Sequence, residues 1–202
     1  MSNSTLLAAL FLTMPTVAVA QSSESRVEAG VFFTYAKLER IGSTDHDVGT
    51  TTAGLGGRVA WRLFRNVDID TEVAVHPRAG VSGYRVQGFL GMKAGASFGG
   101  FGLYAKARPG FLYFEKDPFG VGSAGPTFSF SQWAHSVEPA LDLGVTIEYD
   151  TPAKLVVRFD VGETIVRYNS RTVVSSQLLP PRVEGGFTTR NRQWSLGLGK
   201  RF

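Results

Sequence analysis

His135, Ser136 and Glu138 are the residues whose types and spacing come closest to a catalytic group. A serine becomes a nucleophile when a histidine within hydrogen-bond reach takes its proton and an acid orients that histidine. The segment alternates as a strand does, and neighbours in a strand point to opposite faces. His135 and Ser136 therefore cannot pair directly. Since no such pattern surrounds His46 or His76 either, we predict no catalytic residue.

Two other patterns could indicate ligand chemistry. The segment Gly120–Gly125 matches G-x-G-x-x-G, but a phosphate-binding loop needs a helix after it, and Pro126 begins a Ser/Phe-rich stretch instead. Asp45, His46 and Asp47 could touch a metal ion, although three adjacent residues do not easily converge on one ion. The chain has no cysteine, which excludes disulfides and zinc–thiolate sites. We predict loops at both places, with no cofactor and no metal.

Composition favours one all-β unit. The chain has 202 residues, of which 43% are hydrophobic, 12% are aromatic and 24 are glycine. Its mean hydropathy is close to zero, as expected when only half of each strand is apolar. The net charge is +4 without a basic run, so nucleic-acid binding receives little support.

Eight segments alternate with the period of two that is typical of strands. They cover about 27–36, 52–62, 67–76, 84–96, 101–114 and 134–149, a segment that starts at 155, and 190–202. The connections alternate between short turns and longer loops. The longest loops are expected at Arg40–Gly49, Glu115–Gln132 and Asn169–Phe187.

The last segment places apolar residues on one face and polar or small ones on the other. The apolar set is Trp194, Leu196, Leu198 and Phe202. This alternation with a terminal Phe resembles the closing strand of bacterial outer-membrane β-barrels, which their assembly machinery recognises. Lys200 departs from that pattern, because the position is usually apolar. The resemblance implies that this strand pairs with the first one and leaves no sheet edge.

The N-terminus has the features of a secretory signal. Leu6–Met14 is a short apolar core, and Ala18-Val19-Ala20 is a small-residue cleavage motif. We expect residues 1–20 to be a signal peptide and residues 21–202 to form the barrel. An uncleaved N-terminal helix is the alternative, because residues 1–5 carry no Lys or Arg.

The whole pattern resembles the OmpA/OmpX-like barrels. It predicts an all-β, eight-stranded antiparallel up-and-down transmembrane β-barrel with a polar lumen, since such barrels have an even number of strands, short periplasmic turns and longer external loops. The resemblance implies a monomer in the bacterial outer membrane with both termini in the periplasm. It also implies lipid and the barrel-assembly machinery as partners.

The polar faces carry charges of both signs, which can pair in a lumen just wide enough for side chains. Aromatic residues near both ends of the strands also favour a membrane barrel, with its apolar face toward lipid. A soluble barrel of the lipocalin type, with the apolar face inside, is the alternative. The predicted lumen charges are Arg58, Asp70, Glu72, Lys93, Lys106, Arg108, Glu138, Asp142, Arg158 and Asp160.

Three residues do not fit regular strands. Pro109 and Pro139 lie inside strands although proline cannot donate to a ladder. If Phe114 faced Ala134, the two prolines would share one rung. Glu163 falls on an apolar face, where it marks either the membrane boundary or a bulge.

We expect a structural or adhesive function carried by the long loops, and no enzymatic activity. The alternatives are a small ion-conducting pore and a lipid A-modifying barrel enzyme, whose residue pattern is not found around the three histidines. His76 and His135 are expected at the membrane rim. Several arginines near the loops could bind lipopolysaccharide phosphates or simply be solvated: Arg167, Arg171, Arg182, Arg190 and Arg192.

Overall fold

The computed structural model describes residues 26–38, 51–78, 83–115, 135–169, 171–173, 182–184 and 186–202. Its strands are β1 (Val27–Lys37), β2 (Thr51–Phe64), β3 (Val67–His76), β4 (Arg85–Phe98), β5 (Phe101–Phe114), β6 (Ser136–Asp150), β7 (Leu155–Tyr168), β8 (Arg171–Val173), β9 (Arg182–Glu184) and β10 (Phe187–Arg201). The expected signal peptide, the loop 40–49, most of the loop 115–132 and the metal and glycine motifs lie outside the described residues.

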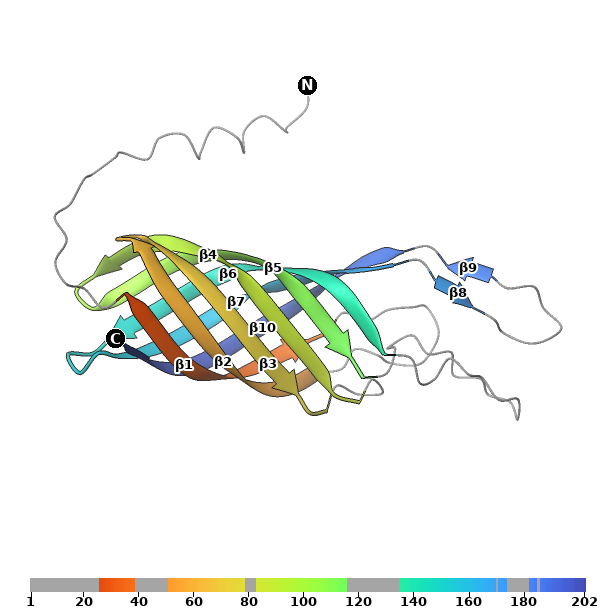
Figure 1. The fold of residues 1–202 in the computed structure, drawn as a ribbon, viewed down its shortest axis with the longest axis horizontal. Coiled ribbons are helices and arrows are strands. Elements are labelled where there is room, and N and C mark those ends of the chain that lie inside the picture. The colour runs from red at the N-terminus through yellow and green to blue at the C-terminus, as the bar shows by residue number, and fades with distance from the viewer. Residues whose placement is uncertain are drawn as a thin grey trace, which may run out of the picture.

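Eight of these strands close into one antiparallel barrel in the order β1-β10-β7-β6-β5-β4-β3-β2 (Figure 1). The last strand pairs with the first along its length, from Glu28 opposite Arg201 to Lys37 opposite Arg192. The predicted closure is thus confirmed, and the barrel has no free edge. Among the described residues, no helix is long and apolar enough to cross a membrane.

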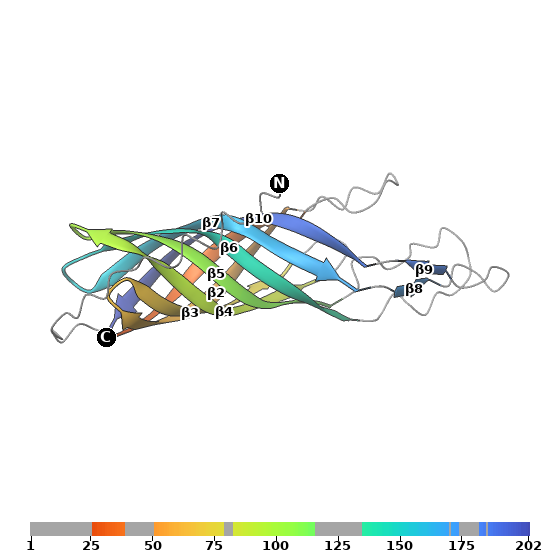
Figure 2. The same cartoon turned by 90° about the horizontal axis from the view of Figure 1, so that it is seen from above.

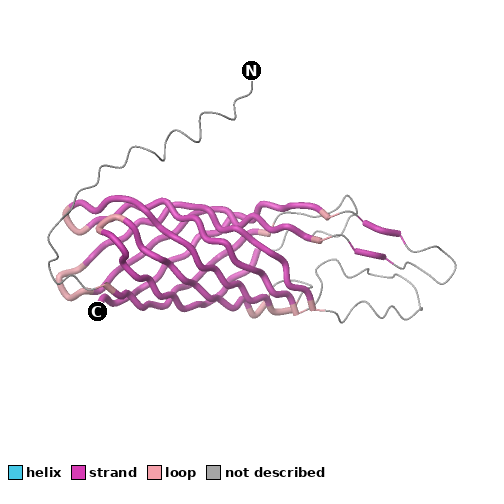
Figure 3. Tube along the Cα trace, turned by 45° about the horizontal axis from the view of Figure 1, so that its top comes forward, coloured by secondary structure: helices cyan, strands magenta, loops and turns pink. Residues whose placement is uncertain are grey.

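The short connections gather at one end of the barrel, where Phe202 also lies, and the longer ones leave from the other end (Figure 3). We call these the turn end and the loop end. The β4–β5 turn shows why the short connections are tight. Gly99 and Gly100 both have positive φ, 57° and 91°, as the two-residue hairpin turns that match strand twist require.

The predicted last loop, Asn169–Phe187, contains structure that alternation did not indicate. The strands β8 and β9 pair with each other as a separate two-stranded sheet beyond the loop end of the barrel (Figure 2). The closing strand also begins at Phe187 rather than at Arg190. Strands this short offer too few residues for a period of two to stand out.

Apolar side chains cover the outside of the barrel, and aromatic residues lie near both of its ends. Trp61 and Tyr149 are exposed near the turn end, while Tyr35 and Trp194 are exposed near the loop end. Tyr35 stacks on Trp194 at a ring-centroid distance of 5.3 Å. This outward apolar face is the reverse of a lipocalin-type barrel.

The register between β5 and β6 corrects the expected one. Phe114 pairs with Ser136, so Pro139 lies opposite Phe111 and Pro109 lies opposite Leu141. The prolines therefore do not share a rung.

Each proline instead interrupts the ladder on its other side, where its missing N–H would have been needed. Pairing between β4 and β5 skips from Phe89–Gly110 to Met92–Ala107, on either side of Pro109. Pairing between β6 and β7 begins only at Ala140, the residue after Pro139.

The proposal of a bulge at Glu163 is wrong. The β6–β7 and β7–β10 registers run through Glu163 without a shift, opposite Leu143 and Arg192. Glu163 faces outward, and its Oε1 lies 4.0 Å from Nε of Arg192. It is a charged residue on the outer wall toward the loop end.

The β5–β6 register can be tested with paired cysteines, because the chain has none of its own. Tyr113→Cys with Val137→Cys should form a disulfide in most molecules, since paired residues have Cα atoms about 4.5–5.5 Å apart. Thiol titration after mild oxidation measures this. The control is Tyr113→Cys with His135→Cys, a diagonal pair about 7–8 Å apart. Faster cross-linking of the control would contradict the register.

Candidate functional site

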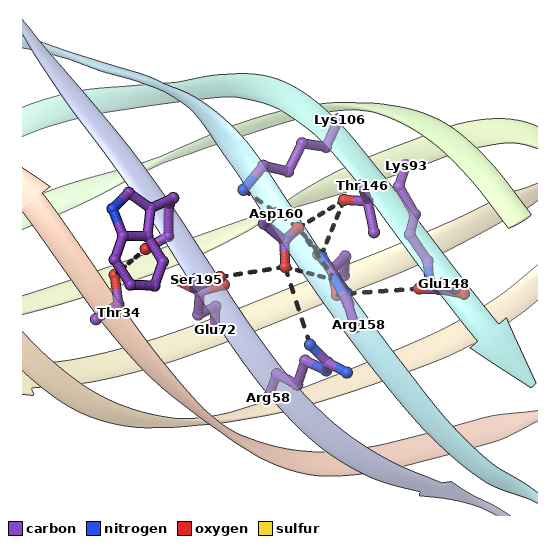
Figure 4. A network of polar contacts seen from close by, with 12 residues as sticks. Thr34, Arg58, Glu72, Lys93, Lys106, Thr146, Glu148, Arg158, Asp160 and Ser195 are labelled. Carbon is purple, nitrogen blue, oxygen red and sulfur yellow. Dashed lines mark hydrogen bonds and ion pairs between the residues drawn. The ribbon is translucent and has the colours of Figure 1, made fainter.

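The lumen is the candidate site, because charged side chains converge there from every part of the barrel. The structure places all ten of the predicted lumen charges on the inner face, and each is buried. Figure 4 shows part of the network that they form. Buried charges are tolerated only when they are paired and hydrogen-bonded, so the contacts of each group decide what the lumen can do.

Asp70 of β3 forms the centre of the network. Its Oδ2 accepts hydrogen bonds from Nη1 of Arg108 at 2.7 Å and from Nη2 of Arg158 at 2.8 Å. Its Oδ1 accepts from Nη1 of Arg158 at 3.0 Å. Because β3, β5 and β7 are not neighbours in the sheet, this carboxylate joins opposite walls of the barrel.

Asp160 of β7 is the second shared carboxylate. It accepts from Nε and Nη2 of Arg158 at 2.9 and 2.8 Å. It also accepts from the hydroxyls of Thr146, at 2.6 Å, and Ser195, at 3.2 Å. Nζ of Lys106 lies 3.5 Å from it.

Arg108 of β5 joins this centre to the loop end. It donates to Asp142 at 2.6 and 2.9 Å, in addition to its bond with Asp70. Its Nη1 lies 2.9 Å from Oε2 of Glu72. Lys106 reaches the same Asp142 carboxylate at 3.0 Å.

The turn end holds a second group of ion pairs, of which only Lys93 was among the predicted lumen charges. Lys93 lies between Asp68, at 3.2 Å, and Glu148. Arg201 contacts Glu148 at 2.9 Å and Glu28 at 3.3 Å. Asp68, Glu148, Glu28 and Arg201 occupy polar-face positions in the same alternation, so that signal could have identified them.

The loop end differs, because it contains a buried cation without a carboxylate partner. Arg85 is 1% exposed and donates to Nε2 of His76 at 2.9 Å and to Oε1 of Gln87 at 3.5 Å. Among the described residues no Asp or Glu forms an ion pair with it, and its Nε has no hydrogen-bond partner. Gln87 in turn donates to Glu72 at 3.3 Å.

The two predicted rim histidines lie in different environments. His76 is completely buried on the inner face, so the rim prediction is wrong for it: the lumen face of β3 continues to the last residue of the strand. His135 is exposed just before β6, and its ring stacks on Tyr113 at 5.8 Å. Ser136 has a buried Oγ without a hydrogen-bond partner, so His135 does not activate it.

An apolar cluster shares the lumen with the charges and was not expected from the sequence. It lies toward the loop end and consists of Phe89, Leu112, Phe114, Ala140, Val166 and Tyr168. These residues occupy inner-face positions of β4, β5, β6 and β7. Together with the ion pairs they fill the interior.

Glycines make this filling possible in a narrow barrel. A Cβ added at Gly197 would lie 2.9 Å from Nη1 of Arg58 and 2.9 Å from Cβ of Phe32. No larger residue fits there without displacing these side chains. Within the described part of the chain, no group of three His, Asp or Glu residues is arranged to hold a metal ion. The lumen network therefore has the chemistry of a structural plug.

The residues of the expected assembly signal lie on the outer wall of β10. Trp194, Leu196, Leu198 and Phe202 are all exposed. Lys200 also points outward, and its Nζ lies 5.7 Å from the centroid of the Phe202 ring. From Trp194 to Phe202 this face is apolar except for Lys200.

Two buried arginines should differ in how much stability is lost when each is replaced by methionine. Arg108→Met leaves Asp70, Glu72 and Asp142 without a cation that they share, and should lower the free energy of unfolding by about 3–5 kcal/mol. Arg85→Met removes a charge that pairs with no carboxylate of the described residues, and it should change the free energy of unfolding by less than about 1 kcal/mol, or raise it. Urea unfolding in detergent micelles measures both. An equal loss of unfolding free energy in the two variants would contradict the proposed difference in how the two arginines are paired.

The comparisons with known proteins bear on the fold. No family model matches the chain, and no curated protein matches it. Among solved structures, it is similar to the N-terminal barrel domain of Pseudomonas aeruginosa OprF, with 12% identity, 89% of this chain and 98% of that one covered, and a TM-score of 0.53. It is also similar to Neisserial surface protein A, with 13% identity, 90% and 100% covered, and a TM-score of 0.50. The chain thus has the fold of the eight-stranded outer-membrane β-barrels, as its sequence predicts.

Proposed function

We propose that the protein is an integral bacterial outer-membrane barrel that acts as a scaffold and displays its long loops for binding or adhesion. The observation that carries this proposal is the filled lumen. Because the interior is occupied by paired charges, an apolar cluster and closely packed glycines, the surfaces left for recognition are the loops and the outer wall.

The outer wall supports the location. Large apolar side chains such as Val31, Leu55 and Leu103 are more than half exposed along the strands, and they need lipid rather than water around them. Aromatic residues at both ends suit two membrane–water interfaces. The similar solved structures include Neisserial surface protein A.

We place the turn end in the periplasm and the loop end outside the cell. Short periplasmic turns and longer external loops are the rule for such barrels. Residues Arg26 and Phe202, the ends of the described barrel, both lie at the turn end and hydrogen-bond to strand neighbours there. The exposed face of Trp194, Leu196, Leu198 and Phe202 is then available to the barrel-assembly machinery during insertion.

A closed sheet also supports a monomer. Every strand of the barrel pairs on both sides, so no edge remains to recruit a second copy. Enzymatic activity on lipid A has no support in the described residues, because His135 and Ser136 do not pair. The mass of lipid A from cells that overproduce the protein would show any such activity.

Orientation can be tested with single cysteines at the two ends of β3. Pro77→Cys at the loop end should react with a membrane-impermeant maleimide on whole cells, because it is exposed and external. Asn66→Cys, also exposed but at the turn end, is the matched control and should react only after lysis. Mass spectrometry of the membrane fraction gives the labelled share. The opposite pattern would mean that the orientation is inverted.

The closed lumen can be tested by electrical recording. The protein reconstituted in planar bilayers should give no steady channel, whereas a porin in the same bilayers does, because the central arginines and Asp70 tie opposite walls together. Stable conductance steps that Gly197→Leu abolishes would contradict the plug and favour the small pore, since that side chain intrudes on Arg58 and Phe32.

A further inference from the structure

A groove of about 610 Å³ runs along the outer wall toward the loop end, where β1, β10, β7 and β6 lie side by side. The residues that give it its chemical character are Tyr35, Lys37, Val161, Glu163, Arg192 and Trp194. These side chains point outward, away from the lumen, so the groove is separate from the lumen.

The strand register divides the groove into two rows. On the side toward the loops, Lys37 lies opposite Arg192, and Arg192 lies opposite Glu163. On the side toward the turns, Tyr35 lies opposite Trp194, and Trp194 lies opposite Val161. The rows are two residues apart, or roughly 7 Å. A charged wall therefore faces an aromatic and apolar wall across a short distance.

The floor between the rows is bare backbone. Gly162 pairs with Gly144 on one side and with Gln193 on the other. Gly162, Gly144 and Gln193 all occupy inner-face positions of their strands, so no side chain rises between the two rows on the outer surface. An occupant can therefore approach the sheet closely between the two walls.

The charged wall has an excess of positive charge. Glu163 is its one acidic residue, and its contact with Arg192 is long, at 4.0 Å, while the Arg192 side chain remains 84% exposed. Within the described residues Lys37 has no acidic partner. A further arginine, Arg167, lies on the outer face still closer to the loops. The wall thus favours an anion.

We propose that this groove binds a phosphorylated lipid of the surrounding leaflet, with a phosphate on Lys37 and Arg192 and an acyl chain along Val161 and Trp194. This inference rests on the proposed membrane location, since the occupant of a groove within a lipid-covered wall is a lipid. Arg and Lys are suited to phosphate, and Trp and Tyr prefer the level of lipid headgroups. The charged row of the groove lies at the level of the lipid phosphate, and the aromatic and apolar row lies at the level of the acyl chain.

The test is native mass spectrometry of the detergent-purified protein with diphosphoryl lipid A as the probe, and with its fully dephosphorylated form for comparison. Wild type should retain one diphosphoryl molecule. The double variant Lys37→Gln/Arg192→Gln should bind it at least about tenfold more weakly, because two charge-assisted contacts are lost. Its binding of the dephosphorylated form should not change. Trp194→Ala should weaken both forms.

Lys200→Gln is the matched control, because Lys200 is an outward cation of the same strand at the opposite end of the barrel. It should bind like wild type. Equal binding by wild type and the double variant, or an equal loss in the control, would overturn the groove. A gel of the membrane fraction, run with boiled and unboiled samples, distinguishes failure of the lipid-binding proposal from failure of the proposed membrane location. If the variants are in the membrane fraction and shift in mobility on boiling, but bind lipid like wild type, only the lipid-binding proposal is refuted. If the wild-type protein is not in the membrane fraction, the proposed location is refuted.

Discussion

The structure depends on the sharing of Asp70 between Arg108 and Arg158. An eight-stranded barrel has an interior just wide enough for side chains, so charges placed there lose most of their water. Such charges are stable only if each finds a partner with good geometry. Asp70 meets this need across the barrel, from β3 to β5 and β7, and the carboxylates of Asp142 and Asp160 extend the network from the same two arginines.

This constraint explains why the barrel has polar residues inside and apolar residues outside, the reverse of a soluble barrel. The charges occupy the inner face of the sheet, and the alternation of a strand then places Val, Leu and aromatic side chains on the outer face. That outer face requires lipid. The paired charges and the apolar cluster occupy the lumen, which leaves the outer wall as the accessible surface of the described barrel. The groove beside Trp194 is one place where the outer wall departs from a uniform apolar surface.

The two ends of the lumen differ in how their charges are paired. At the turn end, Arg201 joins the closing strand to Glu28 of β1 and to Glu148 of β6. Lys93 of β4 contacts the same Glu148 and also Asp68 of β3. At the loop end, Arg85 has no carboxylate partner among the described residues, and an apolar cluster lies beside it in the lumen. The turn end is thus built for rigidity. The loop end carries the less compensated charges, both inside the barrel and on the outer wall at Lys37 and Arg192.

The sequence by itself determined the fold class, the number of barrel strands, the closing pair and the face of each strand that turns inward, because a period of two is a local property that each segment displays alone. It did not determine the β5–β6 register, which depends on how Pro109 and Pro139 interrupt two different ladders. It also did not determine which charges share a partner. Asp70, Arg108 and Arg158 come from strands that are neither consecutive nor adjacent, and only closure of the barrel brings them together. The short β8–β9 sheet, the apolar cluster and the groove likewise arise from contacts between segments, for which no single segment carries a signal.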